Sequence, residues 1–154
     1  MRAVVQRVKT ARVEVDGRVA ARIDAGLLVL LAVAKSDTRW DADYMADKLT
    51  GLRIFADEAG RMNRSVLDTG LALLVVSQFT LYGDVSRGRR PGFERAAGAD
   101  LARTLYEYFL QAVRARGVYV EAGVFQAHMD VHLVNDGPVT IIVDTEAALP
   151  PSAT

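Results

Sequence analysis

Hydrophobic positions in the first 34 residues fall into segments of strand length. Three segments alternate loosely between apolar and polar residues, and the fourth is continuously apolar, as a strand buried on both faces would be. Asp16 and Gly17 separate two of them with the residue pair that a two-residue hairpin turn prefers. The pattern therefore predicts that the chain opens as a β-meander. Its four strands are expected at 2–8, 11–15, 18–23 and 27–34.

Two later segments carry apolar residues at helical spacing. In the first, residues 39–50, Thr38 is placed to cap the N-terminus, with Asp41 three positions on, and Gly51 follows the last turn. In the second, Asp100 is expected to cap the N-terminus and Gly117 to end the helix. Each helix has one apolar stripe, so each is predicted to pack one face against the rest of the protein.

The remaining sequence adds short strands and loops. Five further strands are predicted at 52–55, 71–76, 118–120, 128–134 and 139–144. A turn is expected at 57–60, an irregular segment at 63–68 and a loop at 87–93, and the tail 146–154 is expected to fray. Strands dominate the whole pattern, with two substantial helices, and no linker is long enough to divide the chain into domains.

Composition narrows the class of protein. The 154 residues include no cysteine, and the formal net charge is zero. Disulfides and thiolate sites are therefore excluded, and broad nonspecific binding to nucleic acid is disfavoured, although a local basic patch is not. No apolar run reaches the roughly 18 residues of a membrane span, and the N-terminus lacks the layout of a signal peptide. We expect a cytoplasmic protein that does not enter membranes.

The apolar run 71–76 ends abruptly in the polar residues Ser77, Gln78 and Thr80, with Phe79 among them. Hydroxyl and amide groups at the end of a buried strand can present chemistry at the edge of a sheet. They can equally do no more than satisfy the turn that follows the strand. The position of these residues leaves both interpretations open.

The loop at 87–93 is the most basic local stretch of the chain. It contains Arg87, Arg89 and Arg90 and no acidic residue, and a proline and a glycine follow the arginines. Such a loop is either a solvated surface segment or a contact for phosphate groups.

Two familiar catalytic arrangements fit the sequence poorly. His128, Asp130 and His132 share one face of a predicted strand, but a rise of about 3.3 Å per residue spreads them over about 13 Å, too far to share one metal ion easily. Ser77 is not in a GxSxG elbow, and both histidines lie on that strand, so a serine nucleophile has no obvious base. Hydroxyls, an amide and backbone groups remain, which suit a reaction whose substrate is already activated.

Two motifs carry a family resemblance. The segments SQFTL at 77–81 and NDGPVT at 135–140, in this order and at this separation, closely resemble those of the D-aminoacyl-tRNA deacylases of the bacterial D-tyrosyl-tRNA deacylase type. The resemblance runs from residue 1 to about residue 145 and includes MRAVVQRV at the N-terminus, LRIF at 52–55 and GRRP at 88–91. Gly92 stands where a serine is expected after RRP.

The resemblance implies a single domain over residues 1–145 with a mixed α/β, D-tyrosyl-tRNA deacylase-like fold, made of mostly antiparallel β-sheets and two main helices. It also implies a homodimer. Its reaction is hydrolysis of the ester that joins a D-amino acid, or glycine, to the terminal adenosine of tRNA, with no metal and no organic cofactor. An aminoacyl ester is activated and has a vicinal 2′-hydroxyl, so the substrate can assist its own hydrolysis without a general base from the protein. The protein then has to position the ester and stabilise the oxyanion.

The resemblance also implies roles for particular residues. Ser77, Gln78, Phe79 and Thr80 form the catalytic motif, in which backbone N–H groups near Phe79 and Thr80 stabilise the oxyanion. Thr80 is expected to orient the reacting carbonyl or water, and Ser77 and Gln78 to shape the pocket. The tRNA backbone is expected to contact the loop arginines, Arg87, Arg89 and Arg90.

Chirality is expected to be read by Gly137 and Pro138, joined by a cis bond and inserted into the pocket of the partner subunit. An L side chain would strike this wall, whereas a D side chain would point away, so selection works by rejecting L. Arg7, Val139 and Thr140 are expected to support the pair.

Two other functions remain open. One is a freestanding editor of another mischarged tRNA, with a different chiral wall. The other is a noncatalytic module for tRNA binding or dimerisation, which would protect the ester instead of cleaving it.

Overall fold

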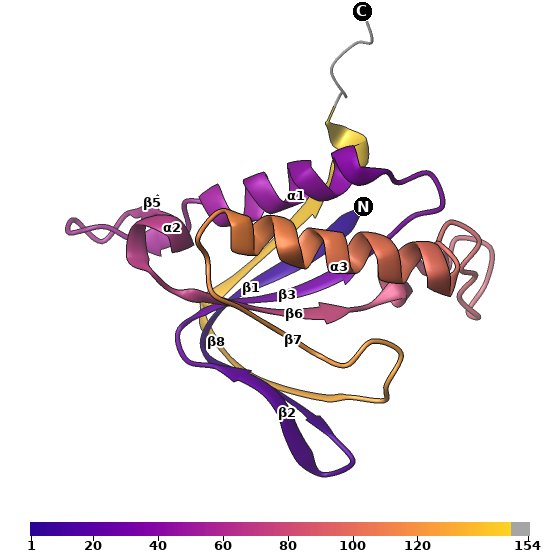
Figure 1. The fold of residues 1–154 in the computed structure, drawn as a ribbon, viewed down its shortest axis with the longest axis horizontal. Coiled ribbons are helices and arrows are strands. Elements are labelled where there is room, and N and C mark those ends of the chain that lie inside the picture. The colour runs from indigo at the N-terminus through magenta and orange to yellow at the C-terminus, as the bar shows by residue number, and fades with distance from the viewer. Residues whose placement is uncertain (149–154) are drawn as a thin grey trace, which may run out of the picture.

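The computed structural model describes residues 1–148 of the chain. A six-stranded sheet has the order β2-β1-β3-β6-β7, with β8 paired to β1. The helices α1 (Arg39–Gly51) and α3 (Ala99–Ala115) lie together over one face of this sheet (Figure 1). The strands are β1 (Arg2–Val15), β2 (Arg18–Ile23), β3 (Gly26–Ala32), β6 (Ala72–Ser77), β7 (Val120–Ala122) and β8 (Asp130–Asp144).

The strand pairing confirms the predicted fold class. β1 pairs antiparallel with β2, β3 and β8, whereas β6 pairs parallel with β3 and with β7. The fold is therefore mixed α/β with mostly antiparallel pairing, and the two main helices are where the sequence placed them. Smaller elements are β4 (Phe55–Ala56), β5 (Met62–Arg64), α2 (Val66–Thr69) and the 3₁₀ helices η1 (Phe79–Tyr82) and η2 (Thr145–Ala147).

The predicted opening meander is wrong. β1 is one strand of 14 residues, and both β2 and β3 pair with it, β2 with its second half and β3 with its first half, as the pairs Ala11–Ile23 and Val8–Gly26 show. β8 pairs with β1 along both halves, which holds the polar stretch at residues 9–10 in strand conformation. The hairpin turn is confirmed, with φ of 51° at Asp16 and 76° at Gly17.

Several element boundaries also differ from the prediction. The α3 helix is capped by Gly98, and Asp100 lies in its first turn. The strand expected at 52–55 is shorter and lies later, since β4 covers only Phe55 and Ala56 and shares just Phe55 with the prediction. The segment 63–68, expected to be irregular, contains the end of β5 and the start of α2, whose N-terminus is capped by Ser65.

The end of the chain is more regular than expected. The two strands predicted at 128–134 and 139–144 are parts of one strand, β8. The first residues of the predicted tail belong to η2, where the Glu146 side chain pairs with Arg95. Residues 149–154 of that tail lie outside the described residues.

Apolar side chains are buried on both faces of the sheet. On the helix side, β-strand residues such as Val29 and Leu73 pack with Met45 and Leu49 of α1 and Phe109 of α3. A second cluster forms on the opposite side, where the outer half of β1 and β2 curl over the middle strands. Its buried members are Val8, Ala11, Val13, Ala21, Ile23, Leu28, Leu74 and Val76.

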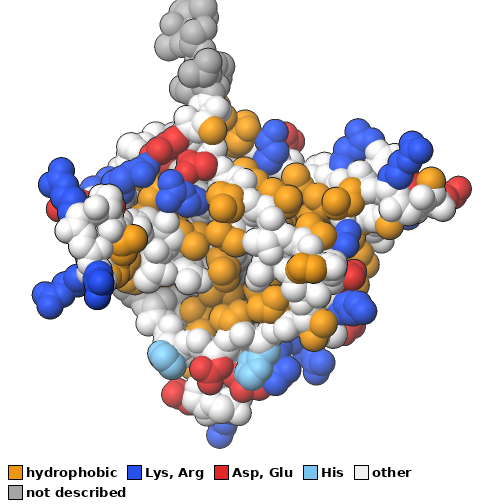
Figure 2. Space-filling view, turned by 180° about the vertical axis from the view of Figure 1, so that it is seen from behind, with side chains coloured by type: hydrophobic (Ala, Val, Ile, Leu, Met, Phe, Trp, Pro, Cys, Tyr) orange, Lys and Arg blue, Asp and Glu red, His pale blue; other side chains and the backbone are white. Residues whose placement is uncertain are grey.

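One part of the face away from the helices stays uncovered. Val4 is paired across the sheet with Leu30 on one side and with Ile142 on the other, so the three side chains form a row. Val4 and Leu30 are half-buried, and Ile142 is 69% exposed. Seen from behind, hydrophobic side chains gather at the centre of this face (Figure 2). A single chain therefore leaves a contiguous apolar surface in water, which is typical of an interface.

Candidate active site

A cavity of about 500 Å³ opens where β6 ends. Three segments form its walls: the end of β6 with η1, the start of α3 with Ala97 shortly before it, and the loop that precedes β8. The lining residues are Ser77, Phe79, Ala97, Ala99, Ala102, Phe125, Gln126, Ala127 and Met129. None of these side chains is ionisable, so the cavity is mostly apolar with a few polar groups, as small-molecule sites usually are.

The motif predicted to be catalytic lies at the edge of this cavity. Ser77 is the last residue of β6, and the Gln78 backbone N–H donates to the Leu31 carbonyl at 2.8 Å before the chain turns into η1. The Gln78 side-chain amide donates to the Thr80 hydroxyl at 3.1 Å, which fixes that hydroxyl next to the turn. Phe79 and Thr80 are exposed at this end of the strand.

Two backbone groups of the turn are available to a ligand. Within residues 1–148, the amide N–H groups of Phe79 and Thr80 make no hydrogen bond, because the turn begins with them and has no earlier carbonyl in reach. Adjacent backbone N–H groups of this kind can stabilise an oxyanion. The predicted role of this backbone is therefore compatible with its geometry.

The loop with the arginines is joined to the same motif. Asp84 and Gly92 exchange two backbone hydrogen bonds, of 2.8 and 2.9 Å, and so close the base of the loop. Phe93, just after this bridge, places its ring against that of Phe79. Gly83 is packed against both segments, since a Cβ there would lie 3.0 Å from the Thr80 carbonyl oxygen and 3.2 Å from the Phe93 ring.

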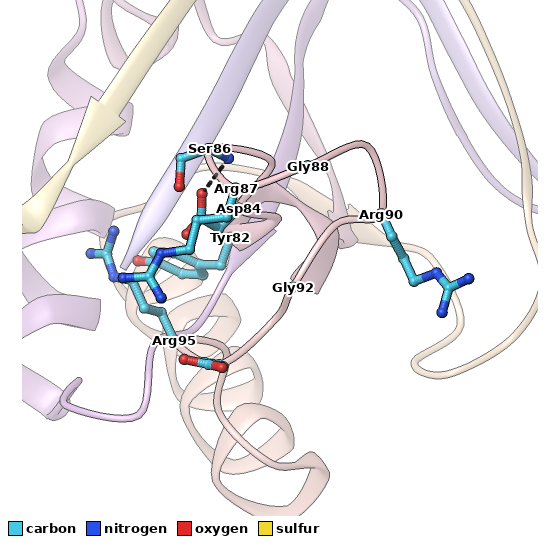
Figure 3. Close-up of a pocket in the computed structure, with 9 residues that line it drawn as sticks. Tyr82, Asp84, Ser86, Arg87, Gly88, Arg90, Gly92 and Arg95 are labelled. Atoms are coloured by element: carbon cyan, nitrogen blue, oxygen red, sulfur yellow. Dashed lines mark hydrogen bonds between the residues drawn. The ribbon is translucent and has the colours of Figure 1, made fainter.

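Arg87, Arg89 and Arg90 are all exposed on this loop, and none forms an ion pair with a residue between 1 and 148. The loop borders a second cavity of about 450 Å³, which Arg87 and Arg95 line together with the carboxylate of Asp84. Asp84 accepts a hydrogen bond from the Ser86 backbone N–H, and Arg90 points away from the other labelled side chains (Figure 3). The loop therefore offers positive charge to the solvent.

Gly137 and Pro138 form an exposed point in the middle of β8, joined by a cis peptide bond. Arg7 stands behind them, and its Nε donates to the Asp136 carbonyl at 2.9 Å while its Nη1 donates to the Ile54 carbonyl. The side chain of Asn135 clamps the other side, accepting from the Val139 backbone N–H at 2.8 Å. The two residues are thus held from both flanks.

Asn135 extends this support to Thr140. Its amide nitrogen donates to the Val139 carbonyl at 3.2 Å and to the Thr140 hydroxyl at 3.3 Å. The Gln6 side chain donates to the same hydroxyl. Arg7, Val139 and Thr140 thus lie near the Gly-Pro pair, with Arg7 bonded to the Asp136 carbonyl and Val139 and Thr140 bonded to Asn135; their supporting role stays a prediction.

Within one chain the two motifs do not meet. Ser77 lies at the level of Ala3, whereas Gly137 and Pro138 lie at the level of Arg7, four residues away along β1. With strands about 4.8 Å apart and residues about 3.3 Å apart, the motifs are separated by about 14 Å across the sheet and about 13 Å along it. The two motifs therefore do not form one compact site within a single chain.

Comparison with known proteins agrees with the motifs. The family model described as D-Tyr-tRNA(Tyr) deacylase matches residues 4–144. D-aminoacyl-tRNA deacylase of Symbiobacterium thermophilum is 58% identical over 146 residues, covering 95% of this chain and 97% of the relative. The Thermus aquaticus protein of the same description is 59% identical over 145 residues, covering 94% of this chain and 95% of the relative. The chain belongs to the D-aminoacyl-tRNA deacylase family.

Solved structures of similar shape extend this family likeness. The c-Myc DNA unwinding element binding protein has a TM-score of 0.88 and is 40% identical, with 94% of this chain and 98% of that chain covered. A probable eukaryotic D-amino acid tRNA deacylase has a TM-score of 0.79 at 21% identity, covering 92% of this chain and 97% of that chain, and shares the fold.

The histidine face, by which we mean the side chains of His128, Asp130 and His132, does not line the cavity. His128 is exposed, and His132 lies against Arg12 and Glu14, at 3.2 Å from the Arg12 guanidinium and 3.3 Å from the Glu14 carboxylate. A hydrogen bond from Arg12 is the main cause that lowers the pKa of Glu14 below its usual value. Residues 1–148 contain no group of three side chains placed to hold a metal ion.

Other cavity residues were not anticipated from the sequence. Phe125, Gln126 and Met129 belong to the segment between the last two strands, and Ala99 and Ala102 to α3. Their contact with the end of β6 depends on how the helix and the loop cross the sheet, and the local sequence carries no signal of it. Gly123 packs closely beside this wall, since a Cβ there would lie 2.8 Å from the Met129 sulfur, so a larger residue would require the Met129 side chain to shift.

Proposed function

We propose that this chain hydrolyses the ester bond between a D-amino acid, or glycine, and the 3′-terminal adenosine of tRNA, and that it rejects the L-amino acid esters. Family membership makes the chain a D-aminoacyl-tRNA deacylase, an ester hydrolase in translation quality control. One observation supports the mechanism most strongly. The cavity beside the motif is lined only by non-ionisable side chains, and Phe79, which lines it, begins the turn whose first two N–H groups, of Phe79 and Thr80, make no hydrogen bond within residues 1–148.

Such a site suits an ester that brings part of its own chemistry. The terminal adenosine would occupy the apolar cavity, with its aminoacyl carbonyl beside η1. Water adds to the carbonyl carbon, the developing oxyanion accepts hydrogen bonds from the two N–H groups, and the ester C–O bond then breaks. The ribose oxygen leaves as a hydroxyl after gaining a proton, for which the vicinal 2′-hydroxyl is the nearest relay. The Thr80 hydroxyl, fixed by Gln78, orients the reacting groups.

The complete site is proposed to form in a homodimer. The two motifs lie far apart in one chain, and the apolar row of Val4, Leu30 and Ile142 needs a cover. A two-fold dimer uses the same patch on both subunits, so burial of this face can bring Gly137 and Pro138 of one subunit to the cavity of the other. The exposed position of the Gly-Pro pair, held from behind by Arg7, supports its role as the chiral wall.

The tRNA itself is proposed to meet the loop with Arg87, Arg89 and Arg90. The loop is anchored beside the motif through Phe93, and Arg87, Arg89 and Arg90 have no carboxylate partner within residues 1–148. Unpaired arginines can neutralise backbone phosphates. The protein is proposed to act in the cytoplasm, where charged tRNA is used. None of the helices in residues 1–148 is long and apolar enough to cross a membrane.

A deacylation time course on D-Tyr-tRNA and L-Tyr-tRNA, each with and without a strong chelator, tests the proposal. We expect rapid loss of the D ester alone, at a rate that the chelator does not change. A rate that falls with chelator would instead favour a metal bound at the histidine face. Equal hydrolysis of both esters would contradict the chiral wall, and protection of both esters would indicate a binding module.

A further inference from the structure

Arg103 stands at the rim of the proposed adenosine cavity. It lies on α3, next to Ala102, which lines the cavity, and one turn after Ala99, which also lines it. Its guanidinium carbon lies 4.6 Å from the centroid of the Phe125 ring, which lines the cavity. The side chain therefore extends from the helix across to the loop on the other side of the cavity.

The wall beneath Arg103 is fixed from behind. The Phe125 ring packs against Tyr106, with 5.7 Å between ring centroids, and the Tyr106 hydroxyl donates to the Val75 carbonyl at 3.1 Å. Burial raises the pKa of Tyr106 to about 12, so this hydroxyl keeps its proton. A guanidinium that stacks on an anchored ring has a defined position, because cation–π contact and ring packing restrict it together.

Arg103 also has unused capacity for an anion. Its Nη2 donates to the Gln126 side-chain oxygen at 3.2 Å, and Gln126 is held in the left-handed region with φ of 64°. No carboxylate of residues 1–148 lies within 4.0 Å of its guanidinium nitrogens. A guanidinium has five N–H donors in a planar fork, so most of them remain free to bind phosphate oxygens.

We propose that Arg103 binds the 5′-phosphate of the terminal adenosine, the phosphodiester that links it to the preceding nucleotide. This inference rests on the proposed function, because it needs adenosine in the cavity. With the base in the apolar interior and the ester at η1, the 5′ side of the ribose must leave through the rim. Arg103 is the cation at that rim, and it acts on the last nucleotide, whereas the loop arginines face the body of the tRNA.

Two small substrates isolate this contact from the rest of the tRNA. One is the 2′(3′)-D-tyrosyl ester of adenosine, and the other is the same ester of adenosine 5′-monophosphate. We expect the phosphate to raise kcat/KM of the wild-type protein about three- to tenfold, the range for a partly exposed charge-assisted hydrogen bond. Arg103→Gln is expected to remove this advantage and to leave the adenosine ester within about twofold of wild type, while Arg103→Lys keeps part of it.

The matched control is Arg114→Gln. Arg114 is an exposed arginine on the same helix, three turns further along and outside the cavity lining, so its variant should keep the full phosphate advantage. A phosphate advantage that survives Arg103→Gln, or no advantage in the wild-type protein, overturns the assignment of Arg103 alone. Failure of the wild-type protein to hydrolyse D-Tyr-tRNA overturns the proposed function, and this subsite with it.

Discussion

The rings of Phe79 and Phe93 meet edge to face, with 5.0 Å between their centroids and 70° between their planes. Phe79 is 53% exposed and lines the cavity, whereas Phe93 belongs to the base of the arginine loop. One aromatic contact therefore joins the part of the protein proposed to hold the ester and the part proposed to hold tRNA. Any change in the loop can reach the backbone of η1 through it.

Replacement of Phe93 by leucine should slow catalysis more than it destabilises the fold. An edge-to-face pair contributes about 0.5–1.5 kcal/mol, so we expect kcat on D-Tyr-tRNA to fall about two- to tenfold as Phe79 loses its orientation. Kinetics and a thermal melt of the same preparation check this. Leu67→Ala, which trims a half-exposed side chain on the distant α2, is the control and should keep its kcat. An unchanged kcat in Phe93→Leu would refute the link.

A methyl group at Gly137 should damage chiral discrimination. Gly137 has φ of 145°, which L residues rarely adopt, and a Cβ there would lie 2.8 Å from the Val139 side chain. The resulting shift of the Gly-Pro pair should lower the D-to-L ratio of kcat/KM by about tenfold or more, since such strain costs about 1–3 kcal/mol. Gly51→Ala, at a position with no atom within 4 Å of the added Cβ, should leave the ratio unchanged. Full discrimination in Gly137→Ala would mean that the pair is not the wall.

Removal of the Thr80 hydroxyl should weaken catalysis without abolishing it. In Thr80→Val the hydrogen bond from Gln78 is lost while the shape of the side chain is kept. Because the hydroxyl orients and does not attack, we expect kcat to fall about five- to thirtyfold, the range of one or two hydrogen bonds. Thr80→Ser should recover most of the rate. Complete loss of single-turnover hydrolysis in Thr80→Val, with Thr80→Ser active, would instead indicate a nucleophilic hydroxyl.

Loss of both histidines should leave the reaction intact. Neither His128 nor His132 lines the cavity, and His132, on β8, contacts Arg12 and Glu14 of β1. We expect the double variant His128→Ala, His132→Ala to stay within about twofold of wild type between pH 6 and pH 8, because no histidine serves as the base. If the rate of the double variant fell by the same large factor at every pH, or if a pH dependence of the wild type near neutrality disappeared in the variant, a histidine would take part in the reaction.

The sequence was informative where structure depends on neighbouring residues. The hairpin at Asp16-Gly17, the helix that starts after Thr38 and the polar end of β6 at Ser77 all follow from local pattern. The sequence was misleading where a strand depends on a partner far along the chain. β1 was predicted as two strands because residues 9–10 are polar. They stay in the sheet through pairing with β8, more than a hundred residues away, as the pair Thr10–Val134 shows. At the α3 N-terminus, aspartate is a stronger capping residue than glycine, so the sequence favoured Asp100. The structure has Gly98 at the N-cap instead, with Asp100 in the first turn.

The candidate site divides in the same way. Ser77 to Thr80 and the Gly-Pro pair are contiguous motifs, which a family resemblance can locate. The cavity wall at Phe125 and the rim at Arg103 are not, because they reach the site only through the packing of α3 and the last loop onto the sheet. On the sequence, Arg103 looks the same as any other exposed arginine of an amphipathic helix.

Subunit mixing tests the central claim, that each site takes its cavity from one copy and its Gly-Pro wall from the other. Ala102→Phe fills the cavity from within, and Gly137→Val puts a bulky side chain on the Gly-Pro pair that blocks the cavity which the pair enters. Each variant alone should therefore lose hydrolysis of D-Tyr-tRNA. After the two are unfolded and refolded together, half of the dimers are mixed and carry one intact site of two, so about a quarter of the wild-type activity should return. If the mixture stays as inactive as its parents while size measurements show mixed dimers, each site is built from one chain and the account is wrong.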